Sequence, residues 1–243
     1  MNDEIIKRLK DEINNSKKIV IFSGAGLSTN SGIPDFRSAD GLYNKKTGYK
    51  VAPEEIISHS FFLKDPKTFY EFYFSKMVYL DALPNDAHIY FKELEKNHDI
   101  TIVTQNIDNL HQMAKSENVI ELHGSIMRNY CMKCNKFYDL KQIYNKNYKV
   151  PYCECGGIIK PDVVLYEEQL NTNAINKAIE SISNADMLIV VGTSLTVYPA
   201  ASFIQYYNKD KLVLINKSKT PYDHIANIVI NDDIKEVVNK LRD

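Results

Sequence analysis

The stretch KIVIFSGAGLSTNSGIPDFR, from Lys18 to Arg37, decides the fold class of this 243-residue chain. Its first six residues form an apolar, β-branched run typical of a buried parallel strand. A Gly-x-Gly turn follows at once, and a helix can begin directly after it. A strand that leads into such a turn and a helix presents backbone N–H groups to a pyrophosphate. The stretch therefore predicts an α/β fold that binds a phosphate group after its first strand.

The rest of the chain supplies more runs of the same kind, separated mostly by helical patterns. They cover residues 100–104, 119–122, 187–192, 211–216 and 227–231. Near the N-terminus, apolar residues from Ile5 to Ile13 recur at helical spacing among charges, which predicts an amphipathic helix rather than a signal peptide. Strands that alternate with helices predict a Rossmann-like parallel sheet.

Two gaps between the predicted strands are too long for a single crossover helix. The first contains an aromatic-rich helical stretch, and the second contains all four cysteines. We predict that these insertions form a separate small domain. The expected division is a Rossmann-like domain of residues 1–37, 81–127 and 160–243, a helical module of residues 38–80 and a cysteine-containing module of residues 128–159.

The cysteines follow the pattern Cys131-x2-Cys134-x18-Cys153-x-Cys155. Without an export signal they are expected in a reducing compartment, where metal ligation is favoured over disulfides. The spacing resembles a four-cysteine zinc ribbon, although the second pair is one residue shorter than usual. Four thiolates leave no open coordination position, so the pattern predicts a structural zinc ion rather than a catalytic one.

Composition and charge narrow the range of partners. The net charge is −1, with 44% hydrophobic and 25% charged residues, which is ordinary for a globular protein. A balanced charge disfavours broad binding to nucleic acid or to an anionic membrane. No apolar run approaches the roughly 18–20 residues that span a bilayer. We therefore expect a cytoplasmic protein that binds neither nucleic acid nor a membrane directly. The sequence leaves the oligomeric state open, with a monomer as one option.

Polar groups follow the second and third predicted strands. The run Gln105-Asn106-Ile107-Asp108 follows the second, and His123 follows the third. Ligands of open α/β sheets bind beyond the C-terminal strand ends, so these groups should converge on one crevice. An amide, a carboxylate and a histidine suit base catalysis on a sugar hydroxyl and a hydrogen bond to a carboxamide. Asn106, Asp108 and His123 are therefore the candidate catalytic residues, and the other histidines are expected to be surface or packing residues.

The glycine turn departs from the fingerprint of an ordinary dinucleotide-dependent dehydrogenase. Thr29 stands at the third glycine position, and Lys45 and Lys46 occupy the window of the usual acidic residue. A hydride-transferring dehydrogenase is therefore the weakest interpretation. Just past the turn, Arg37 suits contact with a phosphate or ribose, and Phe36 could cover a reactive sugar from water.

Taken in order, these elements strongly resemble the sirtuin family of NAD-dependent protein lysine deacylases. The resemblance begins with GAGLSTNSGIPDFR from Gly24, TQNIDNLH from Thr104, the pair His123-Gly124 and the four cysteines. It continues with KPDVV at 160–164, GTSL at 192–195 and LIN at 214–216. The resemblance covers nearly the whole chain and implies a Rossmann-like domain with a small domain beside it.

The resemblance also implies that NAD is bound and consumed as a co-substrate. The implied NAD-binding residues are Gly24, Ala25, Gly26, Thr29, Asp35, Phe36, Arg37, Gln105, Asn106, Ile107, Asp108, Gly192, Thr193, Ser194, Asn216 and Ile234. Asp108 would accept a hydrogen bond from the nicotinamide carboxamide. The adenosine half would lie against the residues at 193, 194, 216 and 234, which accounts for the missing acidic residue after the glycine turn.

The implied chemistry is transfer of an acyl group from lysine to ADP-ribose. The acyl-lysine oxygen would attack the nicotinamide ribose and expel nicotinamide, and His123 would act as general base on a ribose hydroxyl. The products would be free lysine, nicotinamide and O-acyl-ADP-ribose. The peptide would add as a strand between residues 163–167 and 196–199, with Val163, Val164 and Tyr166 in contact with it.

Two departures from the family bear on the substrate. Sirtuins that remove succinyl or malonyl groups carry a Tyr and an Arg three residues apart. Here Tyr73 matches the Tyr, although packing in the aromatic-rich insertion explains it equally well, and Lys76 replaces the Arg and lacks its bidentate fork. Deacetylation is therefore favoured, with acidic acyl groups as a further option. The run Tyr166-Glu167-Glu168 stands where the family often has an aromatic residue, Gly and Glu.

Two alternative functions stay open at this point. One is a sirtuin-like protein ADP-ribosyltransferase, which the intact His123 disfavours. The other is a non-catalytic NAD-sensing protein, which the complete polar set of Asn106, Asp108 and His123 disfavours.

Overall fold

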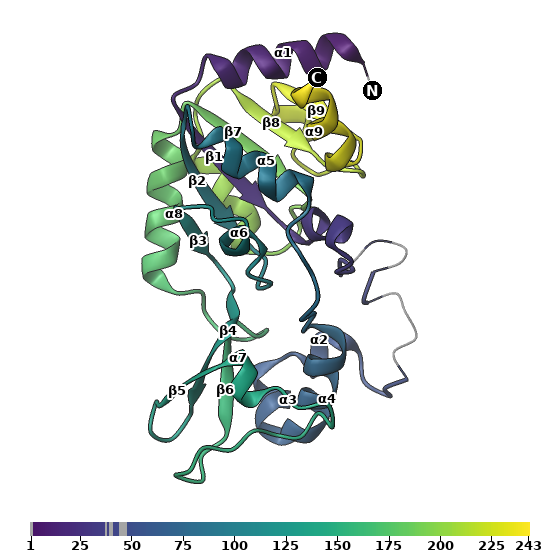
Figure 1. The fold of residues 1–243 in the computed structure, drawn as a ribbon, viewed down its shortest axis with the longest axis vertical. Helices are drawn as coiled ribbons and strands as arrows, with labels where there is room; N and C mark the ends of the chain where they lie inside the picture. The colour runs from purple at the N-terminus through teal and green to yellow at the C-terminus, as the bar shows by residue number, and fades with distance from the viewer. Residues whose placement is uncertain (1, 37, 39–40, 44–47) are drawn as a thin grey trace.

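A six-stranded parallel sheet forms the centre of the larger part of the molecule (Figure 1). The computed structural model describes residues 2–36, 38, 41–43 and 48–243. The strands are β1 (Lys18–Ser23), β2 (Asp99–Thr104), β3 (Val119–Glu121), β7 (Met187–Val191), β8 (Leu212–Ile215) and β9 (Ile228–Ile230), in the order β3-β2-β1-β7-β8-β9. This is the Rossmann order, and each strand lies where an apolar run predicted one, so the predicted fold class is confirmed.

The central strands are apolar on both sides because helices cover both faces of the sheet. One face packs against α1 (Asp3–Asn14), α5 (Asp86–Leu94) and α9 (Ile234–Arg242), with Leu9, Phe91 and Val237 in the shared core. The other face packs against α8 (Thr172–Asn184) and the 3₁₀ helix η2 (Ala200–Tyr206). Three short elements complete this part: η1 (Ala25–Ser31), α6 (Leu110–Met113) and η3 (Asp223–Ile225).

The two insertions form the small domain at the lower end of Figure 1. Its helices are α2 (Pro53–Ile56), α3 (His59–Lys64), α4 (Pro66–Lys76) and α7 (Leu140–Ile143), and its antiparallel sheet has the order β5-β4-β6, made of β4 (Gly124–Cys131), β5 (Phe137–Asp139) and β6 (Ile159–Val163). Aromatic side chains of α3 and α4 fill the core between helices and sheet. The aromatic-rich stretch folds as separate helices because Ser58 and Asp65 cap new helix starts, at Phe61 N (3.2 Å) and Thr68 N (3.1 Å).

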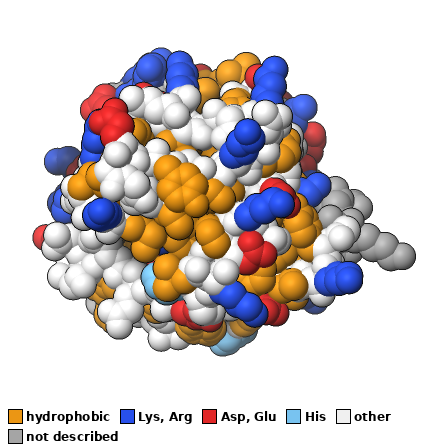
Figure 2. All heavy atoms as spheres, turned by 90° about the horizontal axis from the view of Figure 1, so that it is seen from below, with side chains coloured by type: hydrophobic (Ala, Val, Ile, Leu, Met, Phe, Trp, Pro, Cys, Tyr) orange, Lys and Arg blue, Asp and Glu red, His pale blue; other side chains and the backbone are white. Residues whose placement is uncertain are grey.

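The expected domain limits stay a prediction. The three-stranded sheet reaches from Gly124 to Val163, beyond both limits expected for the cysteine-containing module. Figure 2 shows the small-domain end of the molecule, where hydrophobic side chains lie among both positive and negative groups. Within the part of the chain that the structure describes, no helix has the length and apolar character needed to cross a membrane.

Candidate active site and metal centre

The candidate active site lies where the chain leaves the two central strands, β1 and β7. Gly26 N–H donates to Gly192 O at 2.8 Å, and Gly24 N–H donates to Val191 O at 3.1 Å. Gly192 has φ +61°, and a Cβ there would lie 2.3 Å from the backbone nitrogen of Leu27. Only glycine permits this close approach. The strand order reverses between β1 and β7, which is where open α/β sheets bind their ligands.

Ser28 joins the predicted polar residues into one hydrogen-bonded set. Its hydroxyl donates to Asp108 Oδ2 at 2.6 Å and accepts from Asn106 Nδ2 at 3.1 Å. Asn106 Nδ2 also donates to Gly24 O at 3.0 Å. Ser28 was not among the predicted site residues, although it lies inside the glycine motif. Its role becomes visible only when η1 and the end of β2 are placed side by side.

Asp108 is a buried carboxyl group held at both oxygens. Ser28 bonds one oxygen, and Leu110 N–H donates to the other at 2.9 Å. Burial raises the pKa of Asp108 above its ordinary value, while these two hydrogen bonds act in the opposite direction. The carboxyl group is therefore fixed in position as a hydrogen-bond acceptor close to the glycine turn.

His123 is oriented by a backbone carbonyl. Its Nδ1 lies 2.8 Å from Gln105 O, and a carbonyl oxygen can only accept, so Nδ1 carries the proton and Nε2 is the basic atom. Burial lowers the pKa of His123, and the hydrogen bond to Gln105 O opposes this shift in part. The imidazole is thus neutral near pH 7, in the form that a general base requires.

The remaining cofactor candidates line the same edge of the sheet. Gln105 Nε2 donates to Thr193 Oγ1 at 3.1 Å, which connects the ends of β2 and β7. Thr29 Oγ1 donates to Gly26 O at 2.9 Å and closes the first turn of η1. Ala25, at the start of η1, is partly exposed. The apolar side chain of Ile107 does not lie at this edge but packs against the small-domain core.

The described residues beyond η1 make local contacts with one another. Asp35 Oδ1 accepts from Ser38 N at 2.9 Å, and the rings of Phe36 and Tyr43 lie 5.4 Å apart between centroids. Tyr43 N–H donates to Phe36 O at 2.9 Å. Arg37, which was also predicted, lies outside the described residues.

The predicted adenosine contacts differ in their accessibility. Ser194 is partly exposed at a loop after β7, and its hydroxyl lies 2.7 Å from that of Thr196. Asn216 Nδ2 donates to Ser218 O at 2.8 Å just after β8. Ile234 is buried at the first turn of α9 in the main core. All of these residues follow the C-terminal ends of strands, but their contact with a nucleotide stays a prediction.

We call residues 163–167, beside which the peptide is predicted to add, the substrate segment; it runs from the end of β6 through an isolated bridge between Tyr166 and Ser58. Val164 N–H donates to His123 O at 3.0 Å, which places the segment beside the candidate base. Both backbone groups of Tyr166 bond the chain where α3 begins: Tyr166 N–H donates to Ile57 O at 3.1 Å, and Tyr166 O accepts from His59 N–H at 3.0 Å. The other predicted substrate residue, Val163, ends β6 opposite Gly124.

Glu167 occupies the position of the family's frequent glycine and adopts φ +74°. This left-handed conformation is unfavourable for a residue with a Cβ. Its carboxylate accepts from Ser60 N at 2.8 Å and from Ser60 Oγ at 2.9 Å. The two hydrogen bonds offset the backbone cost and attach the substrate segment to the start of α3.

Tyr73 and Lys76, the candidates for an acyl carboxylate, lie in different surroundings. The ring of Tyr73 is fully buried and stacks on Phe69, with 5.7 Å between centroids. Its hydroxyl has no hydrogen-bond partner among the described residues. Lys76 lines a separate cavity of about 400 Å³ together with Tyr49 and Tyr148. Joint binding of one carboxylate by Tyr73 and Lys76 therefore stays a prediction.

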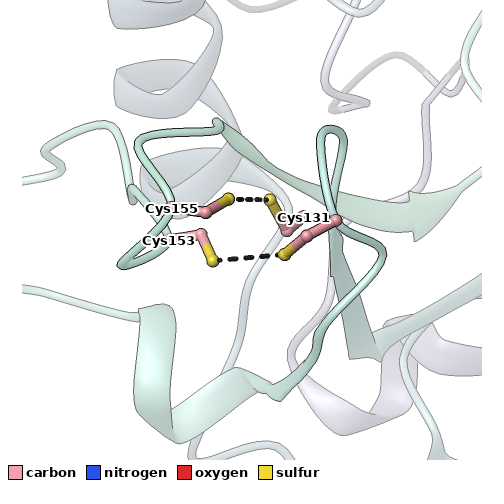
Figure 3. Close-up of side chains that lie close together, drawn as sticks. Cys131, Cys153 and Cys155 are labelled. Carbon is pink, nitrogen blue, oxygen red and sulfur yellow. Dashed lines mark hydrogen bonds between the residues drawn. The ribbon is translucent and has the colours of Figure 1, made fainter.

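The four cysteines form a second cluster in the small domain (Figure 3). All four sulfur atoms lie within 4.8 Å of one another, with 3.4 Å between Cys131 and Cys155 and 3.6 Å between Cys134 and Cys153. These separations are too long for disulfide bonds. A tetrahedron with Zn–S distances of about 2.3 Å has edges of about 3.8 Å, so the four thiols fit a structural zinc ion in spite of the short second pair.

The neighbouring groups also suit a thiolate cluster. Tyr138 Oη–H donates to Cys153 Sγ at 3.1 Å and is the main cause that lowers the pKa of Cys153 to about 6. Lys133 N–H donates to Cys131 Sγ at 3.4 Å. A Cβ at position 157 would lie 2.6 Å from Cys131 Sγ, so Gly157 keeps space for the cluster. Such outer hydrogen bonds orient metal ligands and stabilise their anionic form.

The fold and the site together define a Rossmann-like nucleotide-binding protein with a four-cysteine metal module. The family model described as "Sir2 family" matches residues 24–199. The chain is 57% identical over 234 residues to an NAD-dependent protein deacetylase of Clostridium tetani, covering 96% of this chain and 95% of that protein. The chain therefore belongs to the Sir2 family, and the resemblance expected from its motifs is confirmed.

Two solved structures are similar over nearly the whole chain. One is a Sir2 histidine-to-alanine variant with a deacetylated p53 peptide and 3′-O-acetyl-ADP-ribose; it has a TM-score of 0.88 and 37% identity, and the match covers 97% of this chain and 96% of that one. The other is a Sir2 complex with a p53 peptide and NAD⁺; it has a TM-score of 0.84 and 38% identity, with the same two coverages.

Loss of one cysteine ligand is expected to release the metal and loosen the small domain. In Cys134→Ser we expect clearly less than one zinc per chain by elemental analysis and a lower Tm, because metal binding and ordering of such a module are coupled. Hydrogen exchange should increase over residues 124–163 and much less in β1 and β7. Met132→Ser, an exposed position two residues away, is the matched control. Full zinc content and an unchanged Tm in Cys134→Ser would contradict the assignment.

Proposed function

We propose that this chain is an NAD-dependent protein lysine deacetylase that transfers the acetyl group of acetyl-lysine to ADP-ribose and releases nicotinamide. The proposal is supported chiefly by one set of hydrogen bonds. His123 bonds the backbone carbonyl of Gln105, the residue before Asn106, and Ser28 bonds both Asn106 and Asp108. The deacetylase name of the relatives and the peptide and nucleotide complexes of the similar structures support it.

NAD would bind across the glycine crevice between β1 and β7. The N–H groups of Gly24 and Gly26 already donate to the chain after β7. The start of η1 at Ala25 would therefore supply the backbone N–H that faces a pyrophosphate. Asp108 and Asn106, fixed by Ser28, would bind the nicotinamide carboxamide and orient its ribose. Phe36 would cover that ribose, and Thr193, Ser194 and Asn216 would lie along the adenosine half. In this reaction NAD supplies the ribose carbon that accepts the acyl oxygen, with nicotinamide as the leaving group.

His123 would act as the general base on a ribose hydroxyl. Since Nδ1 donates to Gln105 O, Nε2 can take the hydroxyl proton, and the same hydrogen bond stabilises the imidazolium that forms. The freed ribose oxygen would then attack the carbon of the resulting imidate. The lysine nitrogen would take up a proton and leave as the amine, and water would add to the same carbon, so that the acyl group stays on one ribose oxygen and the other becomes a hydroxyl. A protein ADP-ribosyltransferase would not need this base, so the intact His123 disfavours that alternative.

The partners would be acetyl-lysine segments of other proteins. Such a peptide would pair with the substrate segment on one side and with residues 196–199 on the other, contacting Val163, Val164 and Tyr166. The enclosed Tyr73 hydroxyl supports acetyl over acidic acyl groups, because its ring lies inside the aromatic core. We also propose that the protein works in a reducing compartment such as the cytoplasm, which suits a thiolate-bound metal. Nucleic acids and membranes are not expected as direct partners.

Mass spectrometry of the products tests the proposed function. The protein is incubated with NAD and matched acetyl-, succinyl- and unmodified lysine peptides. We expect the acetyl peptide to release nicotinamide and form O-acyl-ADP-ribose faster than the succinyl peptide, and the unmodified peptide to give neither product. His123→Ala should lower turnover by about 100-fold or more, and His98→Ala, near the opposite end of β2, should not. Intact NAD in every incubation would refute the deacetylase, and ADP-ribose attached to the peptide would favour the transferase.

The pH dependence of kcat/KM should report the depressed pKa of His123. The base is active when neutral, and burial lowers its pKa. Activity should therefore stay level as the pH falls through the ordinary histidine value of about 6.5 and decline only below it. The profile of kcat/KM is the relevant one because it reports groups of the free enzyme. An acid limb centred above pH 7 would contradict the assignment of His123 as a buried base.

Removal of the Glu167 carboxylate should weaken peptide binding. In Glu167→Ala, two hydrogen bonds to Ser60 are lost while the unfavourable φ remains, so we expect KM for the acetyl peptide to rise by about 2- to 10-fold with little change in KM for NAD. Glu167→Gln retains an acceptor and should lie closer to wild type. Glu154→Ala, an exposed position of the metal module, is the control. An unchanged peptide KM in Glu167→Ala would show that this carboxylate does not contribute to peptide binding.

A further inference from the structure

Two histidines that the proposed reaction does not use lie against each other beneath the active site. His88 comes from α5 and His111 from α6, and both side chains are almost completely buried. Their ring centroids are 4.9 Å apart, with the ring planes at 64°. Both were expected to be surface or packing residues. Their hydrogen-bond partners indicate a more specific arrangement.

The partner of His88 defines its tautomer. Asn85 N–H donates to His88 Nδ1 at 3.3 Å, within a reciprocal cap of α5. A backbone N–H can only donate, so Nδ1 is the unprotonated atom and the ring proton lies on Nε2. Burial lowers the pKa of His88 to about 4, which keeps this ring neutral at physiological pH.

The partner of His111 defines the second tautomer. His111 Nε2 lies 3.0 Å from Ser23 Oγ, and the Ser23 hydroxyl donates its own proton to Thr104 Oγ1 at 2.9 Å. Ser23 Oγ therefore accepts from His111, so the proton of His111 is on Nε2 and its Nδ1 is bare. Burial, with a smaller contribution from His88, lowers the pKa of His111 well below its ordinary value.

One ring nitrogen of each histidine remains without a partner among the described residues, and one of the two is a donor and the other an acceptor. His88 Nε2–H is a buried donor and His111 Nδ1 is a buried acceptor, and neither has a partner among the described residues. A buried polar atom without a partner is costly, and such atoms are rare in folded proteins. Two unpaired atoms of opposite kind on touching rings can satisfy each other after a small ring rotation.

The ends of this pair reach both halves of the candidate active site. On the His88 side, Asn85 Nδ2 donates to Leu27 O and to Ser31 Oγ, both at 2.9 Å, and so holds η1. On the His111 side, Ser23 and Thr104 end β1 and β2, and Thr104 Oγ1 accepts from Asn106 N–H at 3.1 Å. The chain of contacts thus runs from η1 to the backbone of Asn106, the residue that carries the candidate catalytic side chain.

We propose that His88 and His111 form a buried N–H···N hydrogen bond, from Nε2 of His88 to Nδ1 of His111, that positions Asn106 relative to η1. The two histidines are positioning residues, since they act through Asn85, Ser23 and Thr104 and do not reach the substrate. Their role in turnover rests on the proposed deacetylase function, whereas the hydrogen bond itself does not.

Nuclear magnetic resonance of the ¹⁵N-labelled wild-type protein tests the hydrogen bond without reference to activity. We expect both rings to be neutral Nε2–H tautomers at pH 7, and a ¹⁵N–¹⁵N coupling across the bond between His88 Nε2 and His111 Nδ1. The exposed His224 should show no such coupling. A proton on Nδ1 of either ring, or two correct tautomers without coupling, would overturn the direct bond.

A double-variant cycle tests the positioning role. His88→Asn retains an acceptor near Nδ1 for Asn85 but lacks Nε2–H, and His111→Gln retains a donor for Ser23 but lacks Nδ1. We expect each to lower kcat by about 10- to 100-fold with peptide KM unchanged, and the double variant to be no worse than either single one. Losses that multiply, or an unchanged kcat in folded variants, would overturn the role.

The two experiments separate the possible failures. If the wild type releases no nicotinamide from NAD and acetyl peptide, the proposed function fails, and the NMR couplings still decide the hydrogen bond. If the variants do not fold, the wild-type spectrum alone decides it. His98→Gln, whose Nδ1 bonds Ser16 O at 2.8 Å away from the site, is the matched control and should leave kcat unchanged.

Discussion

The close approach of the backbone at Gly26 and Gly192 is the constraint on which the rest of the site depends. The two chain segments leave adjacent strands, β1 and β7, and meet at a hydrogen bond of 2.8 Å with no side chain between them. A Cβ at either glycine would lie closer to the other segment than real Cβ atoms are found. This contact fixes where η1 begins, and η1 in turn presents Ser28 to Asn106 and Asp108. A larger residue would displace the whole polar set and not only the turn.

Burial explains why this polar set is so heavily hydrogen-bonded. Asp108 and His123 are both enclosed, and a buried polar group is stable only when its hydrogen bonds are made. Ser28 and Leu110 N satisfy Asp108, and Gln105 O satisfies His123. Burial moves the two pKa values in opposite directions, upward for the carboxyl group and downward for the imidazole. Both shifts favour the neutral form, so the protein holds a neutral base without placing a full positive charge in the crevice.

The sequence predicts the sheet well because its strands are buried on both faces. Runs such as 18–23 and 187–192 are apolar throughout, and this pattern has few alternatives in an α/β chain. Strand ends were predictable for the same reason, so Asn106, Asp108 and His123 were selected from position alone. Ser28, Asn85 and Thr104 were not selected, since short polar residues have many roles and only the tertiary structure shows their partners. Packing was an open alternative for Tyr73, but an aromatic run in a helical insertion does not show which single hydroxyl is enclosed, so the structure was needed to decide between packing and an exposed site.

The small domain and the candidate base are parts of one constraint. Strand β4 begins at Gly124, the residue after His123, and pairs with β6. Gly124 has φ +76°, and a Cβ there would lie 1.9 Å from Asp162 O, so β6 passes directly over the turn that carries the base. The chain then leaves β6 and returns to His123 O through Val164 N at 3.0 Å. The four cysteines lie at the far end of β4 and on the chain entering β6, so a metal ion bound by them would limit how these two strands can move. Metal binding in the small domain would therefore stabilise the position of His123 from a distance.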